Sequence, residues 1–290
     1  MPSNRINTIL QNYASWGLAS SAKPQLLRQL EGGLTNQSFL LQLADECYVL
    51  RLFSPHSQQL NINREAEYRI ASIAAQQGLS PQTIYLAPDH SYSISRYLDA
   101  ELFNHSALSR AEKLQRLAQC LQQLHSIHID IELPQLIVSE KAQHYWQAIA
   151  QLPAAAIYLQ YKAPLQQYFK QLPVLAPPVL CHNDLVVENI LLGEQGLRLI
   201  DWEYAAMGNP YFDLAAVIIN QQLNAENEQL FLGSYTKSVD LLALQQAKLQ
   251  VRYLECLWWL MQSPLNKNFV QQLLQDLLLA TGLEGGEFQR

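Results

Sequence analysis

The pattern of apolar residues changes near residue 98, and this change restricts the fold that the chain can adopt. Before that point, short segments alternate apolar and polar residues, which is typical of strands with one buried face. Five such segments cover 25–30, 38–43, 48–53, 82–86 and 92–98. One helix is expected between the third and fourth, at about 61–77, because its apolar residues would share one face. The first part of the chain is therefore predicted to be a small sheet with one helix.

After residue 105 the pattern is mostly helical. Ser109 and Glu112 form a capping box before an apolar helix face. That face consists of Leu114, Leu117, Leu121 and Leu124. Further helices are expected near 139–151, 159–171, 210–222, 225–236, 240–262 and 266–281. The sequence thus predicts an α+β fold with two parts, a small β-rich lobe at 1–98 and a larger helical lobe at 99–290.

Composition argues against several classes of protein. Apolar residues make up 49% of the 290 and charged residues only 15%, so the chain is not intrinsically disordered. The net charge of −6 argues against nucleic acid as a partner and would suit a cationic ligand. No apolar run approaches the ~20 residues of a membrane span, and the polar N-terminus lacks the apolar core of a signal peptide. The four cysteines lie far apart, which suggests neither a zinc site nor a disulfide framework. We expect a cytoplasmic protein with no membrane partner.

Three polar side chains in the segment 179–214 indicate a chemistry. Asp184 stands in a His-x-Asp sequence, Asn189 follows five residues later, and Asp201 ends a short apolar run. Phosphoryl transfer needs one carboxylate to orient the attacking hydroxyl and oxygen ligands to hold Mg²⁺ against the nucleotide phosphates. An Asp, an Asn and a second Asp in this order meet that need. The segment therefore predicts a phosphotransferase that uses ATP and Mg²⁺.

A chance occurrence is the alternative, because Asp and Asn are common in loops. Apolar runs at 179–181, 190–192 and 197–200 flank the polar residues and predict a hairpin of buried strands with polar groups at the strand ends. Two carboxylates and an amide would be costly at such ends without a ligand or metal to satisfy them. The flanking runs thus favour a functional site.

The same segment resembles the aminoglycoside phosphotransferase and choline kinase superfamily, the small-molecule relatives of protein kinases. Its sequence IDWEYA at 200–205 is similar to the choline, ethanolamine and thiamine kinase branch, and LRLIDWEYA followed by DLAAV is particularly similar to bacterial thiamine kinases. Protein kinases carry Asp-Phe-Gly at this point, and the chain also lacks their G-x-G-x-x-G, V-A-I-K and A-P-E motifs. The resemblance implies a bilobal protein-kinase-like fold with the nucleotide held by the first lobe.

Each polar residue of the segment then has an expected role. Asp184 would orient the substrate hydroxyl or accept its proton, while Asn189 and Asp201 would ligate Mg²⁺ through oxygen. His182 is expected to brace the loop through hydrogen bonds rather than to act as a base. Asp213, near the start of a predicted helix, would either hold the catalytic loop in place or simply cap the helix.

The first lobe offers two candidate contacts for the phosphates. The loop that contains Gly32, Gly33, Thr35 and Asn36 resembles the first loop of the choline kinases, where glycine amides can approach phosphate oxygens closely. An ordinary hairpin turn is the alternative. Arg51 stands where the family places a basic residue against the phosphates, and an exposed position at a strand edge is the alternative.

A glutamate from the following helix is expected to pair with Arg51. Glu67 is preferred to Glu65 because its spacing from the end of that helix fits the family, and ordinary helix surface is the alternative for both. The segment that joins the lobes follows the last strand. By its position there, backbone groups near Tyr97 and Leu98 would meet the adenine edge of the nucleotide.

The acceptor would be recognised by acidic and aromatic groups. Glu203 could face the acceptor, and Trp258 with Trp259 resembles the segment with which choline kinases enclose a trimethylammonium group, although Glu255 stands in the upstream place, where with Trp258 it could still bind a cation. That segment has two tryptophans three residues apart, whereas here Trp259 is adjacent to Trp258 and points ~100° away. This difference weakens choline and leaves ethanolamine or the thiazolium of thiamine. A tryptophan packed in a helical core is the alternative.

Three hypotheses for function follow. The first is a kinase that phosphorylates the hydroxyl of a small cationic alcohol of the choline, ethanolamine or thiamine type. The second is a kinase of the same fold that acts on an aminoglycoside, a sugar or another small alcohol. The third is a non-catalytic nucleotide-binding protein, which is disfavoured because Asp184, Asn189 and Asp201 are all present.

Overall fold

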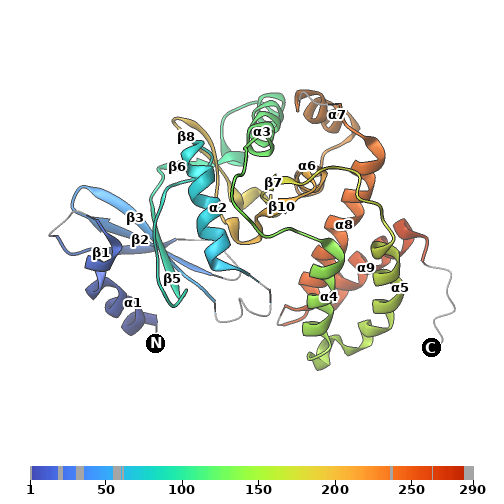
Figure 1. Cartoon of the computed structure of the whole chain (residues 1–290), viewed down its shortest axis with the longest axis horizontal. Helices are drawn as coiled ribbons and strands as arrows, with labels where there is room; N and C mark the ends of the chain where they lie inside the picture. Colours follow the sequence, from blue (N-terminus) through green and yellow to red (C-terminus); the bar gives the residue numbers. More distant parts are fainter. Residues whose placement is uncertain are drawn as a thin grey trace. The chain divides into compact units, whose positions relative to one another are not determined.

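The structure is a computed structural model of the chain, and it describes residues 2–18, 22–30, 36–54, 60, 62–235, 238–262 and 264–283. The chain forms two compact units, which we treat separately (Figure 1). The first unit consists of Met1–Gln58, Ile62–Ser109 and Val187–Tyr204. The second unit consists of Gln59–Asn61, Arg110–Val186 and Ala205–Arg290.

The first unit contains an antiparallel sheet of five strands in the order β1-β2-β3-β5-β4. The strands are β1 (Gln25–Leu30), β2 (Gln37–Leu43), β3 (Glu46–Leu52), β4 (Thr83–Leu86) and β5 (Tyr92–Arg96). Their alternating apolar residues pack against helix α1 (Pro2–Gln11), which contributes Ile6 and Ile9 to a buried core with Leu41 and Leu50. All five strands were expected from the alternation, whereas α1 was not.

Helix α2 (Arg64–Gln76) belongs to the first unit and carries Glu67. Its start is fixed by Asn63, whose side chain accepts a hydrogen bond from the amide of Ala66. Ile70 and Ala74 lie on its buried face, as the apolar pattern predicts.

A second sheet in the first unit has three strands in the order β6-β8-β9, namely β6 (Ala100–Leu102), β8 (Ile190–Gly193) and β9 (Gly196–Leu199). It explains two differences from the sequence prediction. Because β6 pairs with β8, the first unit extends beyond residue 98 to Ser109 and includes 187–204. The predicted hairpin exists between β8 and β9 only.

The third predicted strand of that hairpin, β7 (Val179–Cys181), lies in the second unit and pairs with β10 (Ala206–Gly208). The other main elements described in this unit are α-helices, as expected. Its helices are α3 (Arg110–His125), α4 (Val138–Ile149), α5 (Lys162–Lys170), α6 (Pro210–Asn220), α7 (Ala225–Ser234), α8 (Leu241–Leu260) and α9 (Lys267–Thr281).

Helices α4, α5, α8 and α9 share a core in which large aromatic side chains are buried. Trp146 donates a hydrogen bond to the hydroxyl of Tyr253, and the ring of Tyr253 stacks on Phe169 at 4.1 Å between centroids. This packing fixes the axis of α8, which carries the expected acceptor residues. Across the described part of the chain, none of the helices combines the length and hydropathy needed to cross a membrane.

Candidate active site

Four charged side chains of the first unit form a closed ring of ion pairs. Glu67 contacts Arg51 at 2.8 Å through one carboxylate oxygen and Arg64 at 2.6 Å through the other. Glu203 contacts Arg64 at 3.0 Å and Arg51 at 3.1 Å, both through Oε2. The ring therefore alternates in charge, and each carboxylate bridges the two guanidinium groups. We call these four residues the charged ring.

Three elements bring the charged ring together. Arg51 comes from β3, Arg64 and Glu67 come from the first turns of α2, and Glu203 comes from the 3-10 helix η6 (Trp202–Tyr204). Arg64 and Glu67 are three residues apart and so share a helix face. The guanidinium of Arg64 also lies 3.9 Å from the centre of the Phe53 ring. Only 3% of the Glu203 side chain and 4% of the Arg64 side chain are exposed, so losing either partner would leave a buried charge uncompensated.

Asp201 is attached to the charged ring through Arg51, which donates to its Oδ1 at 2.5 Å. Its backbone φ is +65°, a left-handed conformation that Asp tolerates better than most residues. The neighbouring Ile200 amide donates to the carbonyl of Asn189 at 3.0 Å, so Asn189 and Asp201 lie at the same end of the β8–β9 hairpin. An amide oxygen and a carboxylate suit the hard cation Mg²⁺, and the structure therefore fits the expected ligand pair.

The surroundings of the charged ring shift two ionisation equilibria. Burial opposes the charge on Arg51, but the carboxylates of Asp201, Glu67 and Glu203 outweigh it and raise the pKa of Arg51. Burial, and then the charge of Asp201, raise the pKa of Glu203, whereas Arg51 and Arg64 act in the opposite direction. Arg51 is thus held as a permanent cation among acids.

The pairing between Arg51 and Glu67 confirms the choice made from the sequence. Glu65, the competitor, pairs instead with Arg69 at 2.6 Å on the exposed side of α2. Glu203, in contrast, was expected to face the acceptor but contacts Arg51 and Arg64 instead. Its carboxylate is buried against two arginines, so its charge is already compensated within the first unit.

Asn36 is held by the charged ring rather than projecting from its loop. Its amide nitrogen donates to Glu203 at 2.8 Å, and its oxygen accepts from the Ser54 amide and from Arg64. The other expected phosphate-loop residues, Gly32, Gly33 and Thr35, lie outside the described residues.

The segment expected to meet adenine follows β5. The amide of Tyr97 donates to the carbonyl of Cys47 at 3.0 Å, so an adenine edge would have to use the Leu98 amide or the carbonyl groups. Leu98 lines a cavity of about 870 Å³ in the first unit, together with Leu192 and Gly193 of β8 and with Arg198 of β9. Leu98, one of the two residues expected to meet adenine, therefore lines this cavity.

In the second unit, Asp213 of α6 anchors the loop that carries Asp184. One carboxylate oxygen accepts from the amide of His182 at 2.8 Å, and the other accepts from the amide of Asn183 at 2.7 Å. The helix cap is supplied by Asn209 instead. Of the two roles expected for Asp213, the structure therefore confirms the anchor. Asn183 has a φ of +63°, which turns the backbone immediately before Asp184.

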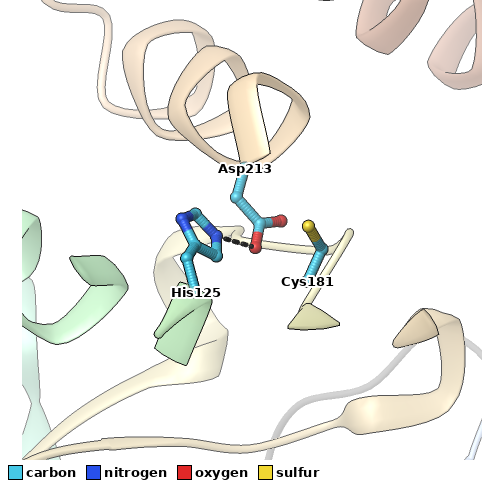
Figure 2. A group of neighbouring side chains, drawn as sticks. All are labelled: His125, Cys181 and Asp213. Carbon is cyan, nitrogen blue, oxygen red and sulfur yellow. Dashed lines mark hydrogen bonds and ion pairs between the residues drawn. The ribbon is translucent and has the colours of Figure 1, made fainter. Parts of the chain in front are cut away.

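Asp213 is in turn held by His125, as Figure 2 shows. The Nε2 of His125 lies 3.1 Å from an Asp213 carboxylate oxygen, and its Nδ1 lies 2.7 Å from the hydroxyl of Tyr235. Cys181 completes the cluster, and burial followed by the charge of Asp213 raises the pKa of its thiol. A metal is disfavoured there, because both histidine nitrogens and both carboxylate oxygens have hydrogen-bond partners and the thiol is held protonated. The cluster is a structural anchor.

A second anchor acts on the other side of Asp184. Asn220, seven residues after Asp213 on α6, donates from its side-chain amide to the carbonyl of Leu185 at 3.1 Å. Two turns of one helix therefore fix the backbone before and after Asp184. Asp184 itself is half-buried, and the His182 side chain is fully buried.

The expected acceptor residues lie on α8. Glu255 and Trp258 are three residues apart, half-buried and on the same helix face. Trp259 packs edge-on against Trp258 and against Phe269 of α9, so it belongs to the helix contact. Burial raises the pKa of Glu255 above its ordinary value of 4.5, although Arg252 and a hydrogen bond from Trp259 oppose this. A carboxylate beside an aromatic ring can bind a cation.

Residues 26–237 match the phosphotransferase enzyme family, abbreviated APH. The chain belongs to this family. Protein LicA of Haemophilus influenzae is 30% identical over 220 residues, which represent 70% of this chain and 61% of that protein. Choline kinase LicA from Streptococcus pneumoniae superposes with a TM-score of 0.77 at 23% identity, over 97% of this chain and 99% of that chain. A structure of LicA in complex with AMP gives a TM-score of 0.78 at 23% identity, over 96% and 98% of the two chains. The expected kinase-like α+β fold is confirmed.

Sequence reasoning missed several residues that hold the candidate site together. Arg64 was overlooked because a charged residue in the first turn of a helix is usually solvated. His125 and Asn220 act through tertiary contacts that no local spacing reveals. The i, i+7 relation of Asp213 and Asn220 was the one available signal.

Proposed function

We propose that the chain is an ATP-dependent kinase that transfers a phosphoryl group to the hydroxyl of a small cationic alcohol. The observation that carries this proposal is the contact of Arg51 with both Glu67 and Asp201, because it joins a phosphate-binding cation to a metal-binding carboxylate. Family membership and the fold that the chain shares with an AMP complex of LicA support the same reading.

The first unit supplies the nucleotide-binding groups in this proposal. Arg51 can hold a phosphate through two parallel hydrogen bonds. Glu67 accepts a hydrogen bond from Arg51 and so keeps the Arg51 guanidinium in place. Asn189 and Asp201 would hold Mg²⁺, which when bound neutralises charge on the transferring phosphoryl group. Arg51 would exchange its contact with Asp201 for one with phosphate, since both partners are anionic oxygens.

The second unit supplies the group that meets the acceptor. Asp184 orients the attacking hydroxyl and takes its proton as the new P–O bond forms and the bond to the leaving diphosphate breaks. Asp213 and Asn220 fix its backbone on both sides, which matters because positioning contributes more than basicity to this reaction.

The acceptor is proposed to be cationic because of Glu255 and Trp258. Glu203 is left out of this role, since Arg51 and Arg64 already compensate its charge. The adjacent Trp259 packs against α9 and does not complete a second aromatic wall, which favours a smaller or flatter cation than choline. Ethanolamine and thiamine fit this description.

The test is an acceptor panel with the full chain. ADP release would be measured with Mg-ATP and choline, ethanolamine, thiamine, kanamycin or glucose, and each acceptor would also be scored by its shift in melting temperature. We expect turnover with one of the three cationic alcohols. Turnover with kanamycin or glucose alone would replace the proposal with a kinase of the same fold and another acceptor. Mg-ATP binding without turnover on any acceptor would count for a non-catalytic nucleotide-binding protein.

A further inference from the structure

We propose that Arg64 is a positioning residue that tunes the charge of the nucleotide site and leaves Arg51 available for phosphate. This inference rests on the proposed nucleotide binding, and it concerns a residue outside the expected pair of metal ligands. Its basis is the set of contacts that Arg64 makes inside the charged ring.

Both terminal nitrogens of Arg64 contact other protein side chains. Its Nη1 contacts Glu67 at 2.6 Å and Glu203 at 3.0 Å, and its Nη2 donates to Asn36 at 3.3 Å. Phe53 covers its guanidinium at 3.9 Å. With 95% of the residue buried, Arg64 cannot swing out to bind phosphate itself (5% of its surface is exposed).

Arg51 differs in one decisive way. It contacts the same two glutamates, but its Nη2 also reaches Asp201 at the more open end of the site, where 25% of the Asp201 side chain is exposed. The two arginines therefore have different roles. Arg64 compensates Glu67 and Glu203, and Arg51 can exchange Asp201 for a nucleotide phosphate.

A charge count shows why this division matters. Two guanidinium groups face three carboxylates, Glu67, Asp201 and Glu203, which leaves a net charge of −1 when all are ionised. Without Arg64 the count becomes −2 at the place where an anionic nucleotide must bind. Both glutamates would then rely on Arg51 alone and would compete with phosphate for it. They would also repel the phosphate, because like charges in a poorly solvated site repel strongly.

Arg64 also connects the end of the expected phosphate loop to the metal-binding segment. Asn36, the last residue of that loop, accepts from Arg64 and donates to Glu203, which stands two residues after Asp201. The same guanidinium thus fixes the spacing between the loop end and Asp201. Its removal is expected to affect nucleotide affinity and leave recognition of the acceptor unchanged.

The experiment compares Arg64→Met with Arg69→Met in the full chain. Arg69 lies on the same helix in an exposed pair with Glu65, so its substitution controls for loss of an arginine and an ion pair. The dissociation constant for Mg-ADP would be measured by calorimetry, alongside the KM for the acceptor and the melting temperature. We expect Arg64→Met to weaken Mg-ADP binding by at least about tenfold, with an unchanged acceptor KM, and Arg69→Met to bind like the parent.

Two further variants separate charge tuning from simple loss of structure. Glu203→Gln in the Arg64→Met background removes the surplus negative charge, and we expect it to restore part of the lost affinity, giving a non-additive double-mutant cycle. Arg64→Lys keeps the charge but cannot bridge two glutamates and Asn36, so a smaller loss of about threefold is expected. Arg64→Lys decides the question if Arg64→Met fails to fold.

The outcomes are distinct from those for the proposed function. If the parent chain does not bind Mg-ADP, the proposed function fails before Arg64 is tested. If the parent binds Mg-ADP, and Arg64→Lys and Arg64→Met bind it as tightly as the parent does, the inference about Arg64 is wrong. Losses that are the same with and without Glu203→Gln would also overturn it, because they would show that Arg64 acts through the fold alone.

Discussion

The two units hold their candidate functional residues by different physical means. In the first, Arg51 forms ion pairs with Glu67, Glu203 and Asp201, so each contact is between charged side chains. In the second, the loop around Asp184 is held through its own backbone, by hydrogen bonds to Asp213 and Asn220. The first arrangement can exchange partners, whereas the second cannot do so without moving the chain.

This difference matches the ligand that each unit is proposed to meet. A nucleotide brings several negative charges and a metal ion, so its site must rearrange its own charges when the ligand binds. A small alcohol brings one hydroxyl that must be aimed accurately, and backbone anchors on a rigid helix do this best. Left-handed φ values occur in both arrangements, at Asn183 beside Asp184 and at Asp201 itself.

The largest expected effect is the loss of turnover in Asp184→Ala. Because Asp184 belongs to the second unit's arrangement, Mg-ADP binding by the first unit should stay within about twofold of the parent while turnover falls by roughly 10²–10⁴-fold. Steady-state kinetics and calorimetry on the same preparation would check both halves. Retained turnover would remove Asp184 from the mechanism, and lost nucleotide binding would show that the two arrangements are not independent.

Asp201→Ala should affect nucleotide and turnover together, in contrast to Asp184→Ala. It removes one proposed metal ligand and also the partner of Arg51, so the Mg²⁺ concentration needed for half-maximal turnover should rise, with turnover reduced by about 10²-fold. A magnesium titration of initial rates is the measurement. Asp45→Ala, at the exposed turn between β2 and β3 of the same unit, is the matched control. An unchanged Mg²⁺ requirement would contradict the role of Asp201.

The contrast between the units also explains what the sequence could predict. Asp184, Asn189 and Asp201 could be proposed from the sequence because of their order along the chain, and the Arg51–Glu67 pair, expected from helix spacing, is present in the structure. The prediction that 179–181 joins the hairpin of 190–192 and 197–200 was wrong, because β7 pairs with β10 instead. The strand β10 has only three residues, and so short a strand leaves almost no alternating pattern in the sequence. Glu203 was placed with the acceptor because its two arginine partners come from β3 and α2, which are distant in sequence, so the sequence did not reveal that its charge is compensated. Tertiary neighbours, rather than spacing, decide what a buried carboxylate does.

Asp213→Asn sharpens the comparison, because it changes charge while preserving shape. One amide oxygen can still accept a backbone hydrogen bond, but the second acceptor becomes a donor that faces the Asn183 or His182 amide. We expect turnover to fall by about tenfold with a lower melting temperature, while Mg-ADP affinity stays near that of the parent. Tyr211→Phe, which removes a hydroxyl from the same helix, is a control outside the anchor. Weaker Mg-ADP binding in Asp213→Asn would argue against separate arrangements.

Glu255→Gln tests the pH behaviour of the proposed cation site. Burial raises the pKa of Glu255 above 4.5, so the folded chain binds this proton more readily than the unfolded chain does. Its favourable contribution to stability is present below the unfolded pKa and is lost as pH rises through the folded pKa. Glu255→Gln should therefore raise the melting temperature at neutral pH. At the same time it should raise the acceptor KM by about tenfold, as expected when a binding charge costs stability.

The same variant should flatten the pH dependence of acceptor binding. In the parent, acceptor KM should rise as pH falls toward the raised pKa, because the carboxylate becomes neutral. The exposed Glu140→Gln substitution on α4 provides the control. A parent KM that does not change with pH, or a Glu255→Gln variant that is less stable at neutral pH, would show that Glu255 is part of the core rather than of the acceptor site.

The smallest expected effect belongs to Asn220→Leu, which keeps the size of the side chain but removes the donor to the Leu185 carbonyl. The helix should persist, because Leu is a good helix former and position 220 is its last residue. One lost hydrogen bond corresponds to about 1 kcal/mol, so kcat should fall by about fivefold with both KM values unchanged. Asn220→Gln, which keeps a donor on a longer side chain, should recover part of kcat. A fall in melting temperature with no change in kcat would assign Asn220 to stability alone, and Asp184 would then be positioned by Asp213 from one side only.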